Sequence, residues 1–309
     1  MKNYFRIACV VLTGLNFSIT SCRPYMDTAV PKSFPSFYKE GHRGTRGLMP
    51  ENTIPSMIKA IELGANVIEV DVYTSKDGKV IVTHDPYVNA DHSFAPDGKE
   101  LTKEEANKYV FHHMNYDEIR KFDVGSKYFK TYPQQKKIVT YIPLLGELID
   151  SVELYIKKNN LSKVIYNIEL KSSVKYDSVY NARPQELVDA VLEVVKSRDL
   201  NTSRYYIQSF DMRPLQYIKK KYPKVVIGFL TDNKNNTFEQ NIKELGFSPH
   251  IYSPHYSLIN SDLIKKAHDK NIKVVPWTVN TEEKVNELVN LGVDGIITDY
   301  PNYLKDINK

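Results

Sequence analysis

Residues 41–86 have the sequence GHRGTRGLMPENTIPSMIKAIELGANVIEVDVYTSKDGKVIVTHDP. Two histidines, His42 and His84, lie near its ends, and two carboxylates, Glu69 and Asp71, interrupt a run of aliphatic residues. Because side chains alternate across a β-strand, Glu69 and Asp71 share one face. Core packing gives no reason for two acids in an apolar strand. The stretch therefore predicts a polar site at the end of a strand.

The same stretch contains a signal for a β-hairpin. Two apolar runs flank residues 74–79, a connection too short for a helix, and Asp77-Gly78 is typical of a two-residue turn. If those two residues form the turn, the residue numbers of each cross-strand pair add up to 155. Asp71 then lies opposite His84, and we expect both side chains on one face.

Strand and helix patterns alternate along the rest of the chain. Strands are expected at 37–42, 67–73, 80–84, 164–170, 205–209, 225–230, 250–253, 274–279 and 295–298. Apolar residues recur at helical spacing over 54–63, 144–158, 185–198, 211–221, 261–269 and 281–291. Such alternation favours parallel strands and an α/β fold, best accommodated as a (β/α)8 TIM barrel in which the second hairpin strand is the ninth and extra one.

One long segment, residues 86–142, interrupts this alternation in the N-terminal half. Barrel enzymes carry their excursions at the carboxyl ends of the strands, where the active site lies. We therefore interpret the segment as an insertion that covers or borders the pocket. Residues 37–309 are then one barrel domain.

Composition and charge limit the classes of function. The 309 residues are 41% apolar and 26% charged, which is ordinary for a globular protein. The formal charge is +5, and removal of residues 1–21 takes away Lys2 and Arg6 and leaves +3. Charge this weak and scattered does not favour nucleic-acid binding. We expect no nucleic-acid partner and no required protein partner.

The first residues have the layout of a secretory signal. Lys2 and Arg6 flank an apolar stretch too short to span a bilayer, and Ile19-Thr20-Ser21-Cys22 resembles the lipobox of bacterial lipoproteins. Cleavage before Cys22 would leave that cysteine as the lipidated first residue. The alternative is an ordinary signal peptide with an incidental cysteine.

The expected mature chain begins with a tether. Residues 22–36 contain three prolines and no periodicity, as in a linker between a lipid and a domain. The protein would then be extracytoplasmic and held to a membrane, in the periplasm or at the cell surface, through Cys22. The remaining cysteine, Cys9, lies in the leader, so the mature chain can form no internal disulfide.

Motifs spread over residues 38–302 resemble one known family. They are His42-Arg43-Gly44, Pro50-Glu51-Asn52-Thr53, 64–72, 74–78, His84-Asp85, 116–119, 142–145, Ile168-Glu169-Leu170-Lys171, Gln208-Ser209-Phe210-Asp211, Trp277-Thr278-Val279-Asn280 and 294–299. Their order and residues are similar to those of the glycerophosphodiester phosphodiesterase family. The resemblance implies a metal-dependent hydrolase that cleaves small glycerophosphodiesters to sn-glycerol 3-phosphate and an alcohol.

Three carboxylates are candidate metal ligands. Glu69, Asp71 and Glu169 offer hard oxygen donors at expected strand ends, which suit Ca²⁺ or Mg²⁺. Their mutual repulsion is a separate reason to expect one divalent cation. The matching family positions are metal ligands. The alternative is that one or two of them are surface or salt-bridged acids.

His42 and His84 occupy the positions of the family's acid–base pair. Imidazole titrates near neutral pH, so one histidine can accept a proton while the other donates one. The resemblance implies that the substrate's glycerol hydroxyl attacks first and that water then opens a cyclic phosphate. The residues do not distinguish the acid from the base.

Further polar residues are candidates for binding phosphate or supporting the site. Arg43 and Lys171 are suited to hold the phosphate, or alternatively to neutralise the carboxylates. Glu51 and Asn52 lie at a loop corner beside the site, and Asn52 is expected to cap the helix that follows.

Two aromatic residues at expected strand ends complete the candidate site. Phe210 and Trp277 either line the pocket for glycerol or the leaving alcohol, or close the top of the barrel core.

Two other functions remain open. A related barrel phosphodiesterase would act on intact phospholipid or on a polyol-phosphate polymer with the same catalytic residues. A non-catalytic surface lipoprotein would use the barrel for binding, although binding alone does not need an acid–base pair.

Overall fold

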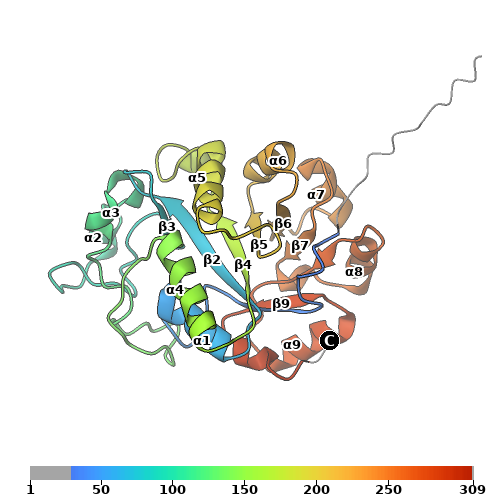
Figure 1. Ribbon diagram of the computed structural model, residues 1–309, viewed down its shortest axis with the longest axis horizontal. Helices are drawn as coiled ribbons and strands as arrows, with labels where there is room; N and C mark the ends of the chain where they lie inside the picture. The colour runs from blue at the N-terminus through green and yellow to red at the C-terminus, as the bar shows by residue number, and fades with distance from the viewer. Residues whose placement is uncertain (1–28, 308–309) are drawn as a thin grey trace, which may run out of the picture.

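The computed structural model describes residues 29–307, so the expected signal peptide and Cys22 lie outside the described residues. Its strands are β1 (Tyr38–Gly41), β2 (Val67–Thr74), β3 (Val80–Val82), β4 (Ile165–Leu170), β5 (Tyr205–Ser209), β6 (Val226–Thr231), β7 (Ile251–Pro254), β8 (Lys273–Val274) and β9 (Gly295–Thr298). Eight of them run in the order β8-β7-β6-β5-β4-β2-β1-β9, with β3 attached to β2. Helices surround this sheet (Figure 1).

The sheet closes into a barrel between its first and last strands. At the end of the short β8, the N–H of Asp294 donates to Val274 O at 2.9 Å, and just beyond it that of Ile297 donates to Pro276 O at 3.0 Å. All paired strands except β3 are parallel. The predicted (β/α)8 barrel is therefore confirmed, and β3 is the extra strand.

The main helices are α1 (Ile54–Glu62), α4 (Leu145–Lys158), α5 (Pro184–Lys196), α6 (Met212–Lys221), α7 (Phe238–Leu245), α8 (Ser261–His268) and α9 (Glu282–Leu291). Sequence analysis missed α7, although Thr237 and Gln240 form a capping box and Gly246 ends the helix in the left-handed region. Among residues 29–307, no helix combines the length and apolarity that crossing a bilayer requires.

The hairpin register differs from the prediction by one residue. Val72 pairs with Val82 and Thr74 with Val80, so opposing numbers sum to 154. The loop has three residues rather than two, with Gly78 at φ 74° after a tight turn. Asp71 O consequently accepts from Thr83 N at 3.0 Å, and Asp71 is not opposite His84, which follows the strand.

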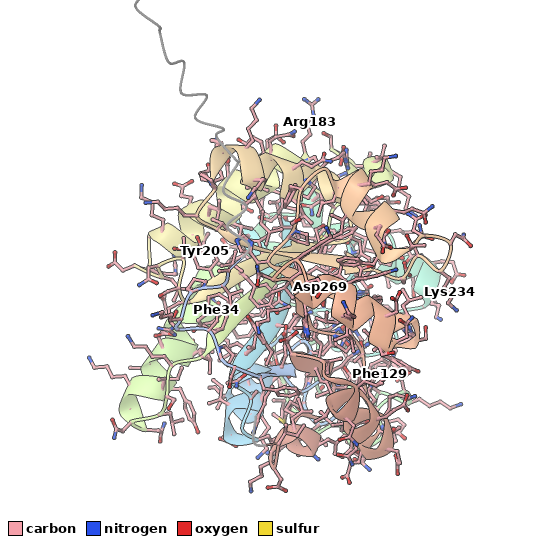
Figure 2. All side chains as sticks on the ribbon, turned by 90° about the vertical axis from the view of Figure 1, so that its right-hand side faces the viewer. Phe34, Phe129, Arg183, Tyr205, Lys234 and Asp269 are labelled. Carbon is pink, nitrogen blue, oxygen red and sulfur yellow. The ribbon has the colours of Figure 1, made fainter. Side chains whose placement is uncertain are left out.

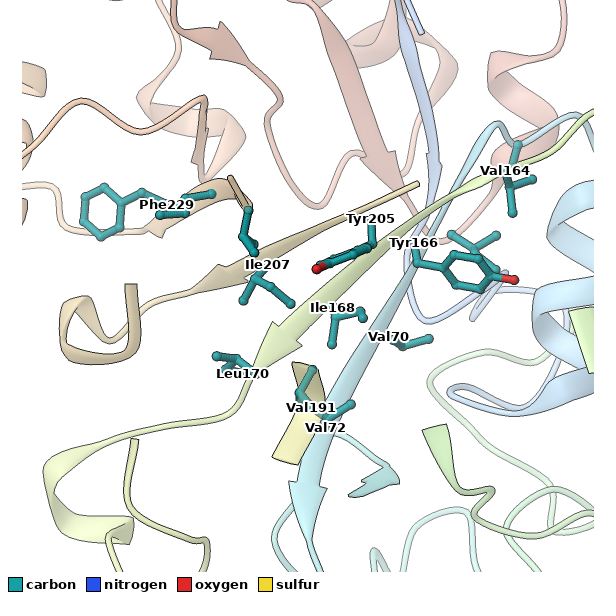
Figure 3. Close-up of a cluster of buried hydrophobic side chains, with 14 of the residues drawn as sticks. Val70, Val72, Val164, Tyr166, Ile168, Leu170, Val191, Tyr205, Ile207 and Phe229 are labelled. Atoms are coloured by element: carbon teal, nitrogen blue, oxygen red, sulfur yellow. The ribbon is translucent and has the colours of Figure 1, made fainter. Parts of the chain in front are cut away.

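The outer face of the sheet forms the main hydrophobic core. Val70 and Val72 on β2 lie beside Ile168 and Leu170 on β4, on the face that the helices cover (Figure 3). Val191 of α5 packs against this layer. Because side chains alternate, the same strands turn Glu69, Asp71 and Glu169 to the barrel interior.

The floor of the barrel is apolar. Tyr38, Val67, Ile165 and Tyr206 belong to one buried interior cluster, and Phe34 joins them with 7% of its surface exposed. Figure 2 shows Phe34 on the segment that leads into β1. The described end of the expected tether therefore lies against the barrel floor.

The insertion packs on the barrel and reaches the strand ends. It contains the short helices α2 (Lys103–Ala106) and α3 (Tyr116–Ile119) and a small core of its own that includes Tyr73 and Ile81 of the hairpin. Gln135 Nε2 donates to Arg46 O at 2.9 Å, and Lys136 N donates to Leu48 O at 2.8 Å. The insertion thus borders the carboxyl ends of the strands, as expected.

A buried carboxyl group, Glu40, lies above the apolar floor. It is fully buried, Tyr206 O–H donates to its Oε2 at 2.7 Å, and Asn167 Nδ2 donates to its Oε1. Burial raises the pKa of Glu40 to about 7, although both hydrogen bonds act to lower it. Sequence analysis did not single out this residue.

We predict that Glu40 makes the stability of the fold depend on pH. Because its pKa is higher in the folded chain, its favourable contribution is complete below about 4.5 and is lost as the pH rises through about 7. Relative to wild type, Glu40→Gln should gain about 2 kcal/mol of unfolding free energy between pH 5 and pH 8. Urea unfolding of both proteins measures this difference. A difference that is constant with pH would contradict the prediction.

Candidate active site

Three buried carboxylates meet at the carboxyl ends of β2 and β4. The parallel register places Asp71 beside Glu169, and Glu69 precedes Asp71 on the same inward face. One oxygen of each residue lies within 4.8 Å of the others, and all three side chains are buried. The structure therefore brings together the three acids that the sequence predicted as a cluster.

Two cations lie against this cluster. Lys171 Nζ is 2.7 Å from Glu169 Oε1 and 3.5 Å from Asp71 Oδ1. Arg43 Nε is 3.2 Å from Asp71 Oδ2. The alternative in which both residues neutralise the carboxylates is thus realised here, and it also places two positive charges where a phosphate would approach.

The charges divide the carboxyl groups into two kinds. Burial acts to raise the pKa of Asp71, but Arg43 and Lys171 outweigh it and hold that pKa well below its usual range. Burial, followed by repulsion from Asp71 and Glu169, raises the pKa of Glu69 well above its usual range. The crowding of the three acids therefore disfavours the charged form of Glu69, and a further positive charge in the cluster would favour it.

The cluster fits a divalent cation. Glu69 Oε1 and Asp71 Oδ1 are buried and have no hydrogen-bond partner. Such orphaned acceptors are costly in a protein interior, and a cation would satisfy both. The donor set consists of carboxylate oxygens alone, as hard cations prefer.

A strained turn after β1 positions the first loop of the site. Arg43 has φ 49° and Gly44 has φ 82°, and a Cβ at Gly44 would lie 2.5 Å from Ser56 Oγ. In this conformation the N–H of Arg43 donates to Glu69 Oε2 at 2.8 Å. The turn therefore orients one carboxylate of the cluster.

The Pro-Glu-Asn-Thr corner holds the other carboxylate and the arginine. Asn52 Nδ2 donates to Asp71 Oδ2 at 2.8 Å, while Asn52 Oδ1 accepts from Asp71 N at 3.2 Å. Glu51 pairs with Arg43 at 2.8 Å and also with Arg46. The prediction that Asn52 caps α1 is wrong: Thr53 is the N-cap, because Asn52 is turned toward β2 at φ 57°.

His42 is held by a residue that sequence analysis did not identify as functional. Its Nδ1 lies 2.6 Å from Oδ1 of Asp299, which is 1% exposed. Tyr132 of the insertion and Asn280 each donate to Asp299 Oδ2, at 2.8 and 2.7 Å. The signal was the acid directly after the last strand, Gly295–Thr298, a position that parallel strands bring next to His42.

The environment of His42 favours its neutral form. Burial and the charge of Arg43 lower its pKa, and Asp299 opposes them only in part. With Nδ1 engaged by Asp299, Nε2 is the nitrogen left for chemistry. His84 is arranged similarly, since its Nδ1 lies 2.9 Å from Asp85 Oδ1.

The two predicted aromatic residues pack together at the rim. The rings of Phe210 and Trp277 meet edge to face with centroids 5.2 Å apart, and His255 packs on Trp277 at 5.3 Å. Trp277 Nε1 donates to Ser253 O at 2.9 Å. Phe210 also lines a cavity with His84 and Lys171. Phe210 thus faces the candidate site, and Trp277 supports it.

Paired histidines, a carboxylate cluster and two cations at the mouth of a (β/α)8 barrel define a barrel hydrolase. Residues 42–303 match the model of the glycerophosphoryl diester phosphodiesterase family. The chain belongs to this family of phosphoric diester hydrolases.

Individual relatives agree over nearly their whole length. The glycerophosphodiester phosphodiesterase of Caldanaerobacter subterraneus subsp. tengcongensis is 31% identical over 264 residues, covering 85% of this chain and 94% of its own. A crystal structure from Silicibacter pomeroyi, assigned to the same family, has a TM-score of 0.76 and 29% identity, covering 87% and 92% of the two chains. An Oleispira antarctica phosphodiesterase in complex with the product sn-glycerol-3-phosphate shares the fold, with a TM-score of 0.66, 24% identity, and coverage of 86% and 94%.

We predict that Ca²⁺ or Mg²⁺ raises the melting temperature of the protein. A cation that binds the folded chain alone stabilises it by about 2.7 kcal/mol at a hundredfold excess over Kd. Glu69→Gln should abolish the increase, because it removes one of the crowded oxygens. The matched variant Glu283→Gln, at an exposed acid on α9, should keep it. Equal increases in both variants, measured by differential scanning calorimetry, would locate the cation elsewhere.

Proposed function

We propose that this protein hydrolyses small glycerophosphodiesters to sn-glycerol 3-phosphate and an alcohol, with one divalent cation, Ca²⁺ or Mg²⁺, held by Glu69, Asp71 and Glu169. The observation that carries the proposal is the buried carboxylate cluster flanked by two carboxylate-oriented histidines. A bound cation would supply positive charge to the phosphoryl oxygens. Family membership makes the chain a phosphodiester hydrolase, and the site supports this finer assignment.

The histidines suit the two proton transfers of the reaction. An attacking hydroxyl loses a proton as its oxygen bonds to phosphorus, and the leaving alcohol oxygen gains one as its bond to phosphorus breaks. His42 is suited to accept the first proton at Nε2, because its surroundings favour the neutral ring. His84, which lines a cavity together with Glu169 and Lys171, is suited to donate the second.

Arg43 and Lys171 are suited to bind the phosphate. Each already lies within 3.5 Å of a carboxylate oxygen of the cluster. Arg43 offers a planar fork of donors, and Lys171 offers a compact charge in the cavity that also contains His84. The relative named glycerophosphodiester phosphodiesterase supports the same substrate class, as does the Oleispira protein with its bound product.

Activity on soluble diesters tests the proposal. We expect the chain from residue 23 to release glycerol 3-phosphate from glycerophosphocholine and glycerophosphoethanolamine, with loss in EDTA and recovery on adding Ca²⁺ or Mg²⁺. His42→Ala should lower kcat roughly 10²- to 10⁴-fold, because it removes the proton acceptor. Coupled enzymatic detection of glycerol 3-phosphate measures both effects.

The companion variant Asp299→Asn separates positioning from folding. Asp299 touches His42 and not the cluster, so the variant should lower kcat more than it changes KM and should shift the pH profile of kcat. Release of glycerol 3-phosphate that EDTA does not affect would contradict the proposed requirement for a divalent cation. Activity on phosphatidyl lipids or polyol-phosphate polymers alone would favour the related phosphodiesterase, and no activity on any diester would favour a binding lipoprotein.

We also propose that a lipid on Cys22 holds the protein to a membrane outside the cytoplasm. The charged-then-apolar leader and the sequence Ile19-Thr20-Ser21-Cys22 support this proposal.

Expression of the full chain tests the anchor. The protein should incorporate labelled palmitate and sediment with membranes, whereas Cys22→Ser should do neither, because the thiol is the acceptor of the lipid. The mutation lies outside the barrel, so phosphodiesterase activity serves as its control for folding. A Cys22→Ser chain that still sediments with membranes and carries label would overturn the anchor.

A further inference from the structure

A cavity of about 240 Å³ opens beside the carboxylate cluster. Glu169, Lys171 and His84 line the side of this cavity that faces the cluster. A phosphodiester whose phosphoryl group lies against these residues has room for one of its two alcohol portions in the cavity. The chemistry of the remaining walls therefore bears on which alcohol the site accepts.

Half of the remaining lining residues are aromatic. Four rings line the cavity: Tyr73, Tyr87, Tyr176 and Phe210. They come from separate parts of the chain, namely strand β2, the loop after β3, the loop after β4 and the end of β5. Tyr73 also belongs to the small core of the insertion, whereas Tyr87, Tyr176 and Phe210 belong to none of the buried clusters of the described residues.

The two loops that carry the half-buried rings Tyr87 and Tyr176 are fixed by packing. The ring of Tyr180 meets Tyr176 and Tyr87 edge to face, with centroids 5.4 and 6.5 Å apart. Tyr180 therefore joins the loop after β3 to the loop after β4. Ring contacts between the two loops therefore fix the position of the aromatic wall.

Polar anchors hold the loop after β4 in place. Asn181 is 1% exposed, donates to Lys171 O at 2.7 Å and accepts from Thr74 N at 3.0 Å. The guanidinium group of Arg213 on α6 donates two hydrogen bonds to the carboxylate of Asp177, at 2.6 and 3.1 Å. These contacts preorganise Tyr176 beside the cavity.

The lining favours a cationic occupant mainly through its rings. Glu169 is a proposed ligand of the divalent cation and pairs with Lys171 at 2.7 Å, and Asp85, which orients His84, is the other carboxylate of the lining. A phosphate at the cluster would engage Lys171 further. Aromatic rings attract cations through their quadrupole, and a methylated ammonium has no N–H that needs a hydrogen-bond acceptor. A polyol would instead lose hydrogen bonds against these rings.

We propose that this cavity binds the quaternary ammonium group of a choline-type alcohol, so that the enzyme selects glycerophosphodiesters with a trimethylammonium leaving group. The inference rests on the proposed hydrolysis of glycerophosphodiesters. Tyr87 and Tyr176 are the specificity-determining residues, and Tyr180 is a positioning residue that acts through them.

A neutral isostere of the substrate isolates the charge. The probe pair is glycerophosphocholine and the same diester of 3,3-dimethylbutanol, in which carbon replaces the ammonium nitrogen. We expect wild type to favour the choline ester about tenfold in kcat/KM, an effect between those of an exposed and a fully desolvated cation–π contact. Tyr176→Ala should remove most of this preference by lowering kcat/KM more for the choline ester than for the neutral ester, whereas Tyr176→Phe, which keeps the ring, should retain it.

Tyr155→Ala is the matched control, because Tyr155 lies on α4 and its hydroxyl bonds Glu62 away from the cavity. It should leave the preference unchanged. Equal kcat/KM for both esters in wild type would overturn the inference while leaving the hydrolase assignment intact. So would a Tyr176→Ala variant that loses activity equally on both esters.

Binding of tetramethylammonium keeps the two proposals distinguishable. Isothermal titration of the full barrel with this ion should show binding that Tyr176→Ala weakens about tenfold and Tyr176→Phe preserves. If no diester is hydrolysed, the proposed function fails, and this titration still decides the cavity. Absence of binding to wild type, or equal binding by the Ala variant, would overturn the ammonium site.

Discussion

The crowding of three buried carboxylates is the constraint that shapes the whole of this site. Two unit charges at the separation seen here repel by about 3 kcal/mol at an effective dielectric of about 20. Arg43 and Lys171 offset the charge of Asp71, and the pKa of Glu69 is raised. Arg43 N and Asn52 donate hydrogen bonds to the two carboxylates of β2. One oxygen of Glu69 and one of Asp71 remain without a hydrogen bond. The site is therefore poised for a further cation, and its supporting loops hold acids that would otherwise separate.

The interior of the barrel changes from apolar to charged along its axis. Tyr38 and Val67 form part of the apolar floor. Glu40 follows Tyr38 on the inward face of β1 and lies in a hydrogen-bonded setting beside Val67, and His42 and Asp71 lie at the mouth. Each step follows from a strand period of two, so one strand supplies both the packing that stabilises the barrel and the groups that carry its chemistry. Burial beneath the mouth also lowers the effective dielectric and strengthens every ion pair there.

Several parts of the molecule follow from local pattern alone. The alternation of strands and helices predicted the barrel. Glu69, Asp71 and Glu169 were predicted as one cluster, because an acid within an apolar strand is rarely left there without a charged partner or a ligand. The hairpin register failed by one residue, since Asp77-Gly78 fits both a two-residue turn and a three-residue loop with Gly78 in the left-handed region. Helix α7 was missed although its capping box and its C-terminal glycine are clear signals.

Strand periodicity and residue chemistry are local properties, and they suffice to predict the barrel, the inward acids and the two histidines from the amino-acid sequence. The three-dimensional arrangement was needed to learn which distant residues complete the site. Asp299 reaches His42 across 257 positions because β9 closes the barrel against β1. Asn52 binds Asp71 instead of capping a helix, and Tyr87 and Tyr176 meet at one cavity through Tyr180. Such contacts depend on strand order, closure and loop packing, which no local pattern encodes.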